Sequence, residues 1–144
     1  MYRIGLLLYG IVLFSEAVCD FRKKEIPLLI FVFALFPMGL ICAATDDISW
    51  KLRLSGAAIG LVFFLLSRLC PGSVGPGDAV GIGQLGFTFG ALRLAVCLGI
   101  SLFLLMVVSA VMFLFRRVGR KDTLPFFPFL FTGFIGMLLA GTGA

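Results

Sequence analysis

Six apolar segments, separated by short links rich in charged residues, glycine or proline, constrain this sequence more than any other feature. The segments cover residues 4–19, 27–44, 54–69, 78–90, 94–115 and 125–140. Only 13% of the 144 residues are charged, whereas a soluble domain carries about 25%. A helix needs about 20 apolar residues to cross a bilayer core of roughly 30 Å. The sequence therefore predicts an all-α integral membrane protein with six transmembrane helices in a single domain, residues 1–144.

Helix packing has to compensate for the short length of some segments. The shortest, residues 78–90, is too short to cross a bilayer core without help. We expect this segment to tilt, to thin the bilayer locally or to lie buried among its neighbours. Gly56 and Gly60, two small residues four positions apart in the third segment, predict a close contact between helices.

The distribution of basic residues indicates how the helices are oriented. Only Arg3 precedes the first segment, whereas basic residues cluster after it, so we predict a retained helix rather than a signal peptide. Six spans place the links after the first, third and fifth segments on one side, with Arg22, Lys23, Lys24, Arg68, Arg116, Arg117, Arg120 and Lys121. The other side holds Arg3, Lys51, Arg53 and Arg93. Because the more basic links stay in the cytoplasm, both termini are predicted to lie outside, and Asp20 and Asp78 share the cytoplasmic face.

Composition excludes several classes of catalytic and binding site. The chain has no His, which excludes Ser-His-Asp and Cys-His catalytic centres. The four cysteines form no CxxC pair, so they offer neither a zinc site nor a redox motif: Cys19, Cys42, Cys70 and Cys97. The net charge of +5 comes from basic residues between apolar segments, which is typical of contact with anionic lipid headgroups. We expect no metal, no cofactor and no nucleic-acid partner.

Ionisable residues within or beside the apolar segments are candidates for function, because the bilayer makes their charges costly. Asp20 ends the first segment, and Asp78 follows a link rich in glycine and proline. Taken singly, Asp78 equally suits a helix cap, and Asp20 suits a surface acid paired with a neighbouring base. Glu16 lies one helical turn before Asp20, where the two carboxyl groups could share a proton or a water. Glu16 could equally reach the headgroups or pair with Arg68.

Asp20 and Asp78 are more informative as a pair. Aspartic peptidases use two adjacent carboxyl groups, one taking a proton from water while the other donates a proton to the peptide carbonyl oxygen. A small proton-coupled transporter would also use membrane acids, but near the midplane and on inverted repeats, and no such repeat is visible here. A catalytically silent assembly scaffold with the same fold is the third alternative.

Three motifs give the chain a resemblance to the prepilin peptidases, also called type IV leader peptidases. The first runs from Asp20 through basic residues to Pro27, the second is Gly75-Pro76-Gly77-Asp78, and the third runs from Pro125 to Leu130. The second is similar to the Gly-X-Gly-Asp motif of the family. The resemblance implies a six-helix membrane aspartic peptidase with Asp20 and Asp78 as its catalytic pair. It implies supporting roles for Gly75, Gly77, Pro27, Pro125 and Pro128, and Glu16 is a candidate modulator.

The resemblance also implies a substrate and a location. Family members cut prepilins or prepilin-like proteins at the cytoplasmic face of the cell membrane, after a Gly that ends a short basic leader. The hydrophobic helix of the substrate then lies against the helices of the enzyme, so the implied partners are a prepilin-like protein and the lipid bilayer. Larger members carry a further cysteine-containing region and methylate the new N-terminus. We expect this chain to be a peptidase without methyltransferase activity, similar to the short enzymes of tight-adherence pilus systems.

Two places depart from the family pattern. After Asp78 the chain has Ala79, Val80 and Gly81, where many relatives have a Val-Lys-Leu-Leu type of run, so Val80 replaces a frequent Lys. Phe127 stands between two prolines where relatives have Gly. We expect Phe127 to narrow the substrate groove, and we expect the departures to shift substrate preference.

Overall fold

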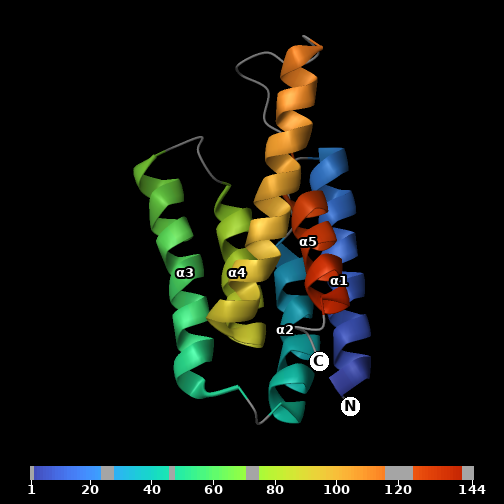
Figure 1. Cartoon of the computed structure of the whole chain (residues 1–144). Helices are drawn as coiled ribbons and strands as arrows, with labels where there is room; N and C mark the ends of the chain where they lie inside the picture. Colours follow the sequence, from blue (N-terminus) through green and yellow to red (C-terminus); the bar gives the residue numbers. More distant parts are fainter. Residues whose placement is uncertain (1, 24–27, 46–47, 71–74, 116–124, 141–144) are drawn as a thin grey trace.

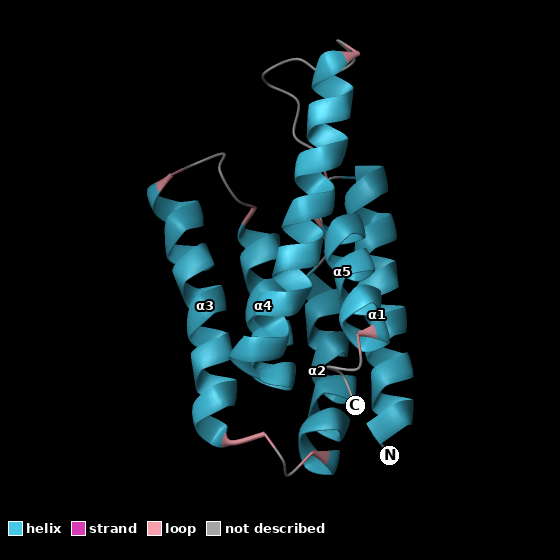
Figure 2. Cartoon of the chain, in the orientation of Figure 1, coloured by secondary structure: helices cyan, strands magenta, loops and turns pink. Residues whose placement is uncertain are grey.

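The computed structural model describes residues 2–23, 28–45, 48–70, 75–115 and 125–140 of the chain. These residues form α1 (Tyr2–Lys23), α2 (Leu28–Ala44), α3 (Trp50–Leu69), α4 (Pro76–Leu114) and α5 (Phe127–Leu139), so the all-α prediction is confirmed (Figure 1, Figure 2). Within them Arg3–Phe21 of α1, the whole of α3 and the whole of α4 are long and apolar enough to cross a membrane. The protein is therefore a multi-pass membrane protein, with α2 and α5 as shorter apolar helices.

Helix α4 contains both the fourth and the fifth predicted segments. Its backbone bends at Gly90, where φ is 81° and ψ is 165°. Glycine adopts a positive φ at little cost, whereas an L side chain is strained there. Figure 1 shows the first half of α4 (yellow-green) running down the bundle and the second half (gold to orange) running back up. The fourth and fifth predicted segments, residues 78–90 and 94–115, thus correspond to the two halves of α4, between which the chain reverses at Gly90 without a separate link. Six membrane crossings with both termini outside remain a prediction.

Glycines bring α3 and α4 into direct backbone contact. A Cβ added to Gly56 would collide with the carbonyl group of Gly86, and a Cβ added to Gly60 would collide with the backbone of Gly83. Because these positions carry no side chains, the two helices approach each other closely. The predicted contact at Gly56 and Gly60 is confirmed, and it holds the short first half of α4 against the length of α3.

Arg53 lies in the first turn of α3 and is only 3% exposed. Its guanidinium donates to the backbone oxygen and the hydroxyl of Thr45, both at 2.8 Å. It also donates to the carbonyl oxygen of Thr88 and to Sγ of Cys42, both at 2.9 Å. Thr45 follows α2 and Thr88 precedes the bend in α4, where helical carbonyl groups lack partners within their own helix. These two helix ends satisfy the donors of Arg53, so this residue is an exception to the headgroup contact that basic residues between apolar segments generally indicate.

The core lies where α1, α4 and α5 meet. The ring of Tyr9 packs against Phe89 and Phe134, with centroids 5.7 Å and 5.9 Å away. Many large apolar side chains outside this core are exposed, as expected for helices that face lipid. In Figure 1 the start of α1 and the end of α5 lie at one end of the bundle, and the end of α1 lies toward the other with the starts of α4 and α5. Residues far apart in sequence therefore meet at this second end.

Candidate active site

Asp20 lies in the last turn of α1 and is 9% exposed. Its Oδ2 accepts a hydrogen bond of 3.1 Å from the backbone N–H of Phe127. Phe127 is the first residue of α5, and the first N–H groups of a helix have no acceptor within that helix. Asp20 thus caps a helix that begins 107 positions later in the sequence.

Asp78 occupies the third position of α4 and is half-buried. Its Oδ2 accepts a hydrogen bond of 3.3 Å from the backbone N–H of Gly75. A Cβ on Gly75 would lie only 3.0 Å from the same oxygen, so glycine leaves room for the carboxyl group. At Gly77 a Cβ would make only an ordinary contact, 3.7 Å from Cζ of Phe31. The two motif glycines therefore differ: Gly75 accommodates the carboxyl group directly, and Gly77 lies farther from it.

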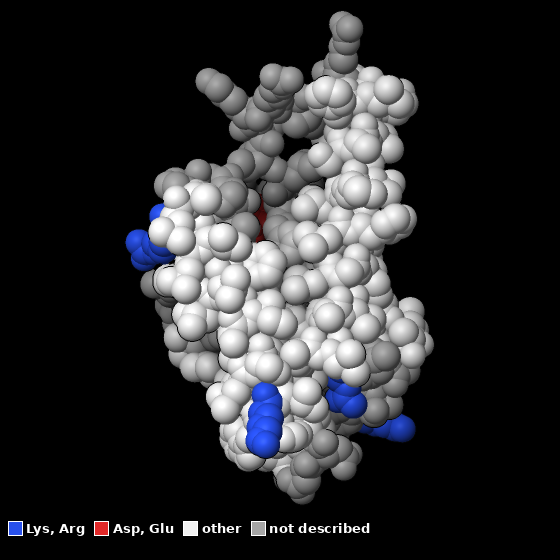
Figure 3. Space-filling model, turned by 60° about the vertical axis from the view of Figure 1, so that its left-hand side comes forward, with Lys and Arg blue, Asp and Glu red and all other residues white. Residues whose placement is uncertain are grey.

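The carboxyl groups of Asp20 and Asp78 lie close enough for their charges to interact. They come from the end of α1 and the start of α4, which are 58 positions apart in sequence but lie toward the same end of the bundle (Figure 1). Figure 3 shows acidic atoms deep in a hollow near this end, whereas the blue side chains of lysine and arginine lie on the outer surface. The structure brings together the two carboxyl groups that the sequence pairs.

Phe127 does not line a groove. Its side chain is 0% exposed and packs on Gly81, where an added Cβ would lie 2.9 Å from Cε1 and Cζ of the ring. The ring of Phe31 lies on it as well, with centroids 6.2 Å apart. The expectation that Phe127 narrows the substrate groove is wrong, because the missing side chain at Gly81 leaves a space in the core that the phenyl ring fills.

Glu16 is buried in α1, with 1% of its surface exposed. Its Oε1 has no hydrogen-bond partner among the residues that the structure describes. Arg68 instead lies over the ring of Phe64, 5.5 Å from its centroid. The alternatives in which Glu16 reaches the headgroups or pairs with Arg68 are therefore wrong, and a third acid lies one turn below Asp20 inside the bundle.

The prolines of the third motif stand at the start of α5. Pro128 is the second residue of this helix, where the missing N–H of proline costs nothing, and Pro125 comes just before it. Both are half-buried. Pro27, the supporting residue that we expected in the first motif, lies outside the described residues.

The carboxyl groups of Asp20 and Asp78 allow acid–base catalysis at this site. Two carboxyl groups in proximity can hold one proton between them, so that one acts as a base and the other as an acid. Within the described ranges, His, Cys, Asp and Glu residues form no group of three or more that could hold a metal ion.

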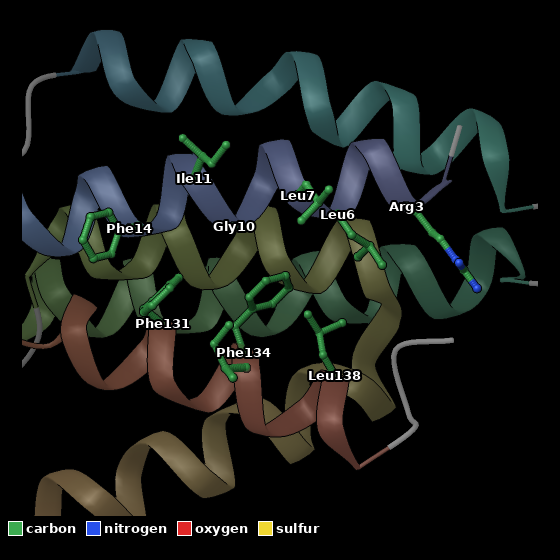
Figure 4. Close-up of a pocket in the computed structure, with 10 residues that line it drawn as sticks. Arg3, Leu6, Leu7, Gly10, Ile11, Phe14, Phe131, Phe134 and Leu138 are labelled. Carbon is green, nitrogen blue, oxygen red and sulfur yellow. The ribbon is translucent and has the colours of Figure 1, made fainter.

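An apolar groove between α1 and α5 leads away from the site, and no sequence motif predicted it. One part is a cavity of about 580 Å³ that extends from Arg3 to Phe14 and Phe131. A second part, of about 350 Å³, shares Phe14 and Phe131 and continues to Phe21 and Pro128. These last two residues are the chain neighbours of Asp20 and Phe127. Figure 4 shows Phe131, Phe134 and Leu138 rising from α5 toward α1 in the first part.

One comparison with known proteins finds a relative. The prepilin leader peptidase/N-methyltransferase of Bacillus subtilis (strain 168) is 30% identical to this chain over 148 residues. The match takes in 97% of this chain, which spans 59% of the length of the relative. No family model matches the chain, and no solved structure matches it significantly. This similarity over nearly the whole chain supports the resemblance to the prepilin leader peptidases that the three motifs indicate.

Proposed function

We propose that this protein is a membrane aspartic endopeptidase that removes the short basic leader of type IV prepilin-like proteins. The observation that carries the proposal is the proximity of Asp20 and Asp78 at one end of the bundle, in a chain that resembles this family. In the proposed orientation this end faces the cytoplasm, in the cytoplasmic membrane, and cleavage follows a Gly at the end of the leader.

The proposed reaction uses the two carboxyl groups in opposite protonation states. The ionised group takes a proton from a water molecule, whose oxygen attacks the carbonyl carbon of the scissile peptide. The protonated group donates its proton to the carbonyl oxygen, which gives a neutral tetrahedral intermediate. When this intermediate collapses, the C–N bond breaks as the nitrogen takes up the proton that the first carboxyl group removed from water. One hydroxyl group of the intermediate returns its proton to the second carboxylate, and the amine leaves with both carboxyl groups back in their starting states.

Glu16 is the proposed modulator of this pair. It lies one helical turn before Asp20, and its Oε1 has no hydrogen-bond partner among the described residues. A carboxyl group in such surroundings is costly to charge. Its replacement by Gln would keep the shape of the side chain and remove the titrating group.

The substrate proposed here carries a hydrophobic helix directly after the leader, and we assign this helix to the groove between α1 and α5. The groove is apolar along nearly its whole length, and it ends at the neighbours of Asp20 and Phe127. A helix lying in it would bring its N-terminal end, where the leader is joined, to the level of the carboxyl pair.

The test is cleavage of a panel of prepilin-like substrates by purified wild type, Asp20→Asn and Asp78→Asn, with products identified by mass spectrometry. We expect a single cut after Gly by wild type and none by either variant, because an amide serves neither as base nor as proton donor. Activity in either variant would overturn the assignment of the pair. Wild type that is folded but cuts nothing would favour the scaffold or the transporter, and proton flux into vesicles would separate these two.

A further inference from the structure

Phe127 touches both of the helices that carry the carboxyl groups. Its backbone N–H donates to Asp20 at 3.1 Å, and its ring rests on Gly81, which follows Asp78 by one helical turn. We propose that Phe127 is a positioning residue that sets the distance between Asp20 and Asp78. Gly81 is the residue against which its ring packs. This inference rests on the proposed peptidase function.

The residues packed around the ring of Phe127 leave it little freedom to move. The side chain of Phe127 is fully buried, and a Cβ at Gly81 would lie 2.9 Å from two of its ring carbons, closer than such contacts normally come. Phe31 packs on the ring too, with an interplanar angle of 55°. Protein interiors are as dense as organic crystals, so a ring held in this way has essentially one position.

The position of the ring determines the position of the N–H group, because both belong to one residue. Phe127 begins α5, and Pro125 and Pro128, whose own φ angles are fixed, stand on either side of it. A ring displaced from Gly81 would carry the N–H group, and with it the carboxyl group of Asp20, away from Asp78. Misplacement of a catalytic group by about 1 Å costs on the order of 100-fold in rate.

The two departures from the family pattern, at Gly81 and at Phe127, concern residues that contact each other. At the position of Gly81 the resemblance indicates Leu, and at the position of Phe127 it indicates Gly. In this structure the two positions lie against each other, because the ring of Phe127 packs on Gly81. The pair is therefore expected to tolerate the reciprocal exchange better than either single change.

The first experiment measures kcat and KM for a prepilin-like substrate with Phe127→Ala, Phe127→Leu, Gly81→Leu and the double variant Gly81→Leu/Phe127→Gly. Phe89→Ala is the matched control, since Phe89 is a similarly buried phenyl ring of α4 that packs on Tyr9 and Phe134 instead. We expect kcat to fall about 100-fold in Phe127→Ala and in Gly81→Leu with KM changed less than about 3-fold. Phe127→Leu, which keeps most of the bulk, and the double variant should recover about 10-fold of this loss, whereas Phe89→Ala should keep kcat within about 3-fold of wild type. Equal losses in Phe127→Ala and Phe89→Ala, or a double variant no better than Gly81→Leu, would overturn the proposal.

The second experiment does not depend on any substrate. Spin labels on cysteines at the exposed positions Phe21 and Pro76, in a background with the four native cysteines replaced, report the distance between the end of α1 and the start of α4. Phe127→Ala should broaden this distance distribution, and Phe89→Ala should leave it unchanged. An unchanged distribution in Phe127→Ala refutes the positioning role even if wild type cleaves prepilins. A wild type that cleaves nothing while the distribution broadens refutes the peptidase function alone.

Discussion

The carboxylate of Asp20 accepts its hydrogen bond from the N–H of Phe127, so one residue serves as a cap for α5 and as a member of the proposed catalytic pair. These two roles have different chemical requirements. A cap needs only an oxygen that accepts a hydrogen bond, whereas catalysis needs a group that gains and loses a proton.

Substitutions at Asp20 should therefore separate stability from activity. Asp20→Asn keeps an acceptor oxygen and should unfold near the wild-type temperature, while Asp20→Ala should lose about 1 kcal/mol of stability with the cap. Neither variant should cleave a prepilin. Thermal unfolding in detergent checks the first statement, and equal stability of the two variants would contradict it.

Gly75 and Gly77 should differ in their tolerance of a methyl group. Alanine at position 75 presses its Cβ against Oδ2 of Asp78 and should lower kcat about 10-fold, because the carboxyl group must move. Alanine at position 77 makes only an ordinary contact with Phe31 and serves as the control. Steady-state kinetics of the two variants checks this prediction. A larger fall in kcat in Gly77→Ala than in Gly75→Ala would contradict it.

The contact between α3 and α4 should be sensitive to a single methyl group. Gly56→Ala forces the backbones of two helices apart and should cost about 2 kcal/mol. Gly39→Ala is the matched control on α2, since nothing lies within 4 Å of a Cβ there. Thermal unfolding of both variants in the same detergent makes the comparison, and equal unfolding temperatures would mean that the close approach contributes nothing.

Filling the groove between α1 and α5 should weaken substrate binding. Leucine at Gly10, whose Cβ would lie 3.6 Å from the ring of Phe134, should raise KM about 10-fold and leave kcat near its wild-type value. Gly99→Leu, at an open position of α4, is the control. An unchanged KM together with less co-purified lipid would assign the groove to an acyl chain instead.

Arg53 should matter far more for stability than an exposed arginine. Arg53→Met leaves the carbonyl groups of Thr45 and Thr88 without their donor and should cost roughly 3 kcal/mol. Arg68→Met, on the exposed end of α3, should change stability by less than about 1 kcal/mol. Similar unfolding temperatures for the two variants would show that the buried hydrogen bonds of Arg53 carry no net stability.

Much of the fold follows from the sequence, because the length of an apolar segment indicates a membrane helix and the basic links indicate its orientation. The meeting of Asp20 and Asp78 also follows, since an even number of helical segments between them returns the chain to the same end. The reversal inside α4 also follows, because it falls at Gly90, the residue at which the fourth predicted segment ends. The start of α3 at Trp50, four residues before the predicted one, depends on Ser49, whose hydroxyl accepts from the N–H of Lys51.

Other features were missed because they depend on contacts between distant residues. The rule that basic residues mark the cytoplasmic side treats every arginine as exposed, so it gives no sign that Arg53 is buried. The burial of Phe127 depends on an absent side chain at Gly81, on another helix. The sequence around Arg53 or around Phe127 therefore does not identify the residues that each of them contacts.

The hydrogen bonds of Arg53 have a consequence for biosynthesis. Until the first half of α4 has been synthesised, α3 enters the bilayer with a cation whose acceptor at Thr88 does not yet exist. An arginine in a membrane helix opposes insertion by about 2.5–3.5 kcal/mol at the centre of the helix and less near its end. Helix α3 and the first half of α4 should therefore leave the translocon as one unit, with the glycine contact and the Arg53 hydrogen bonds forming in the same event.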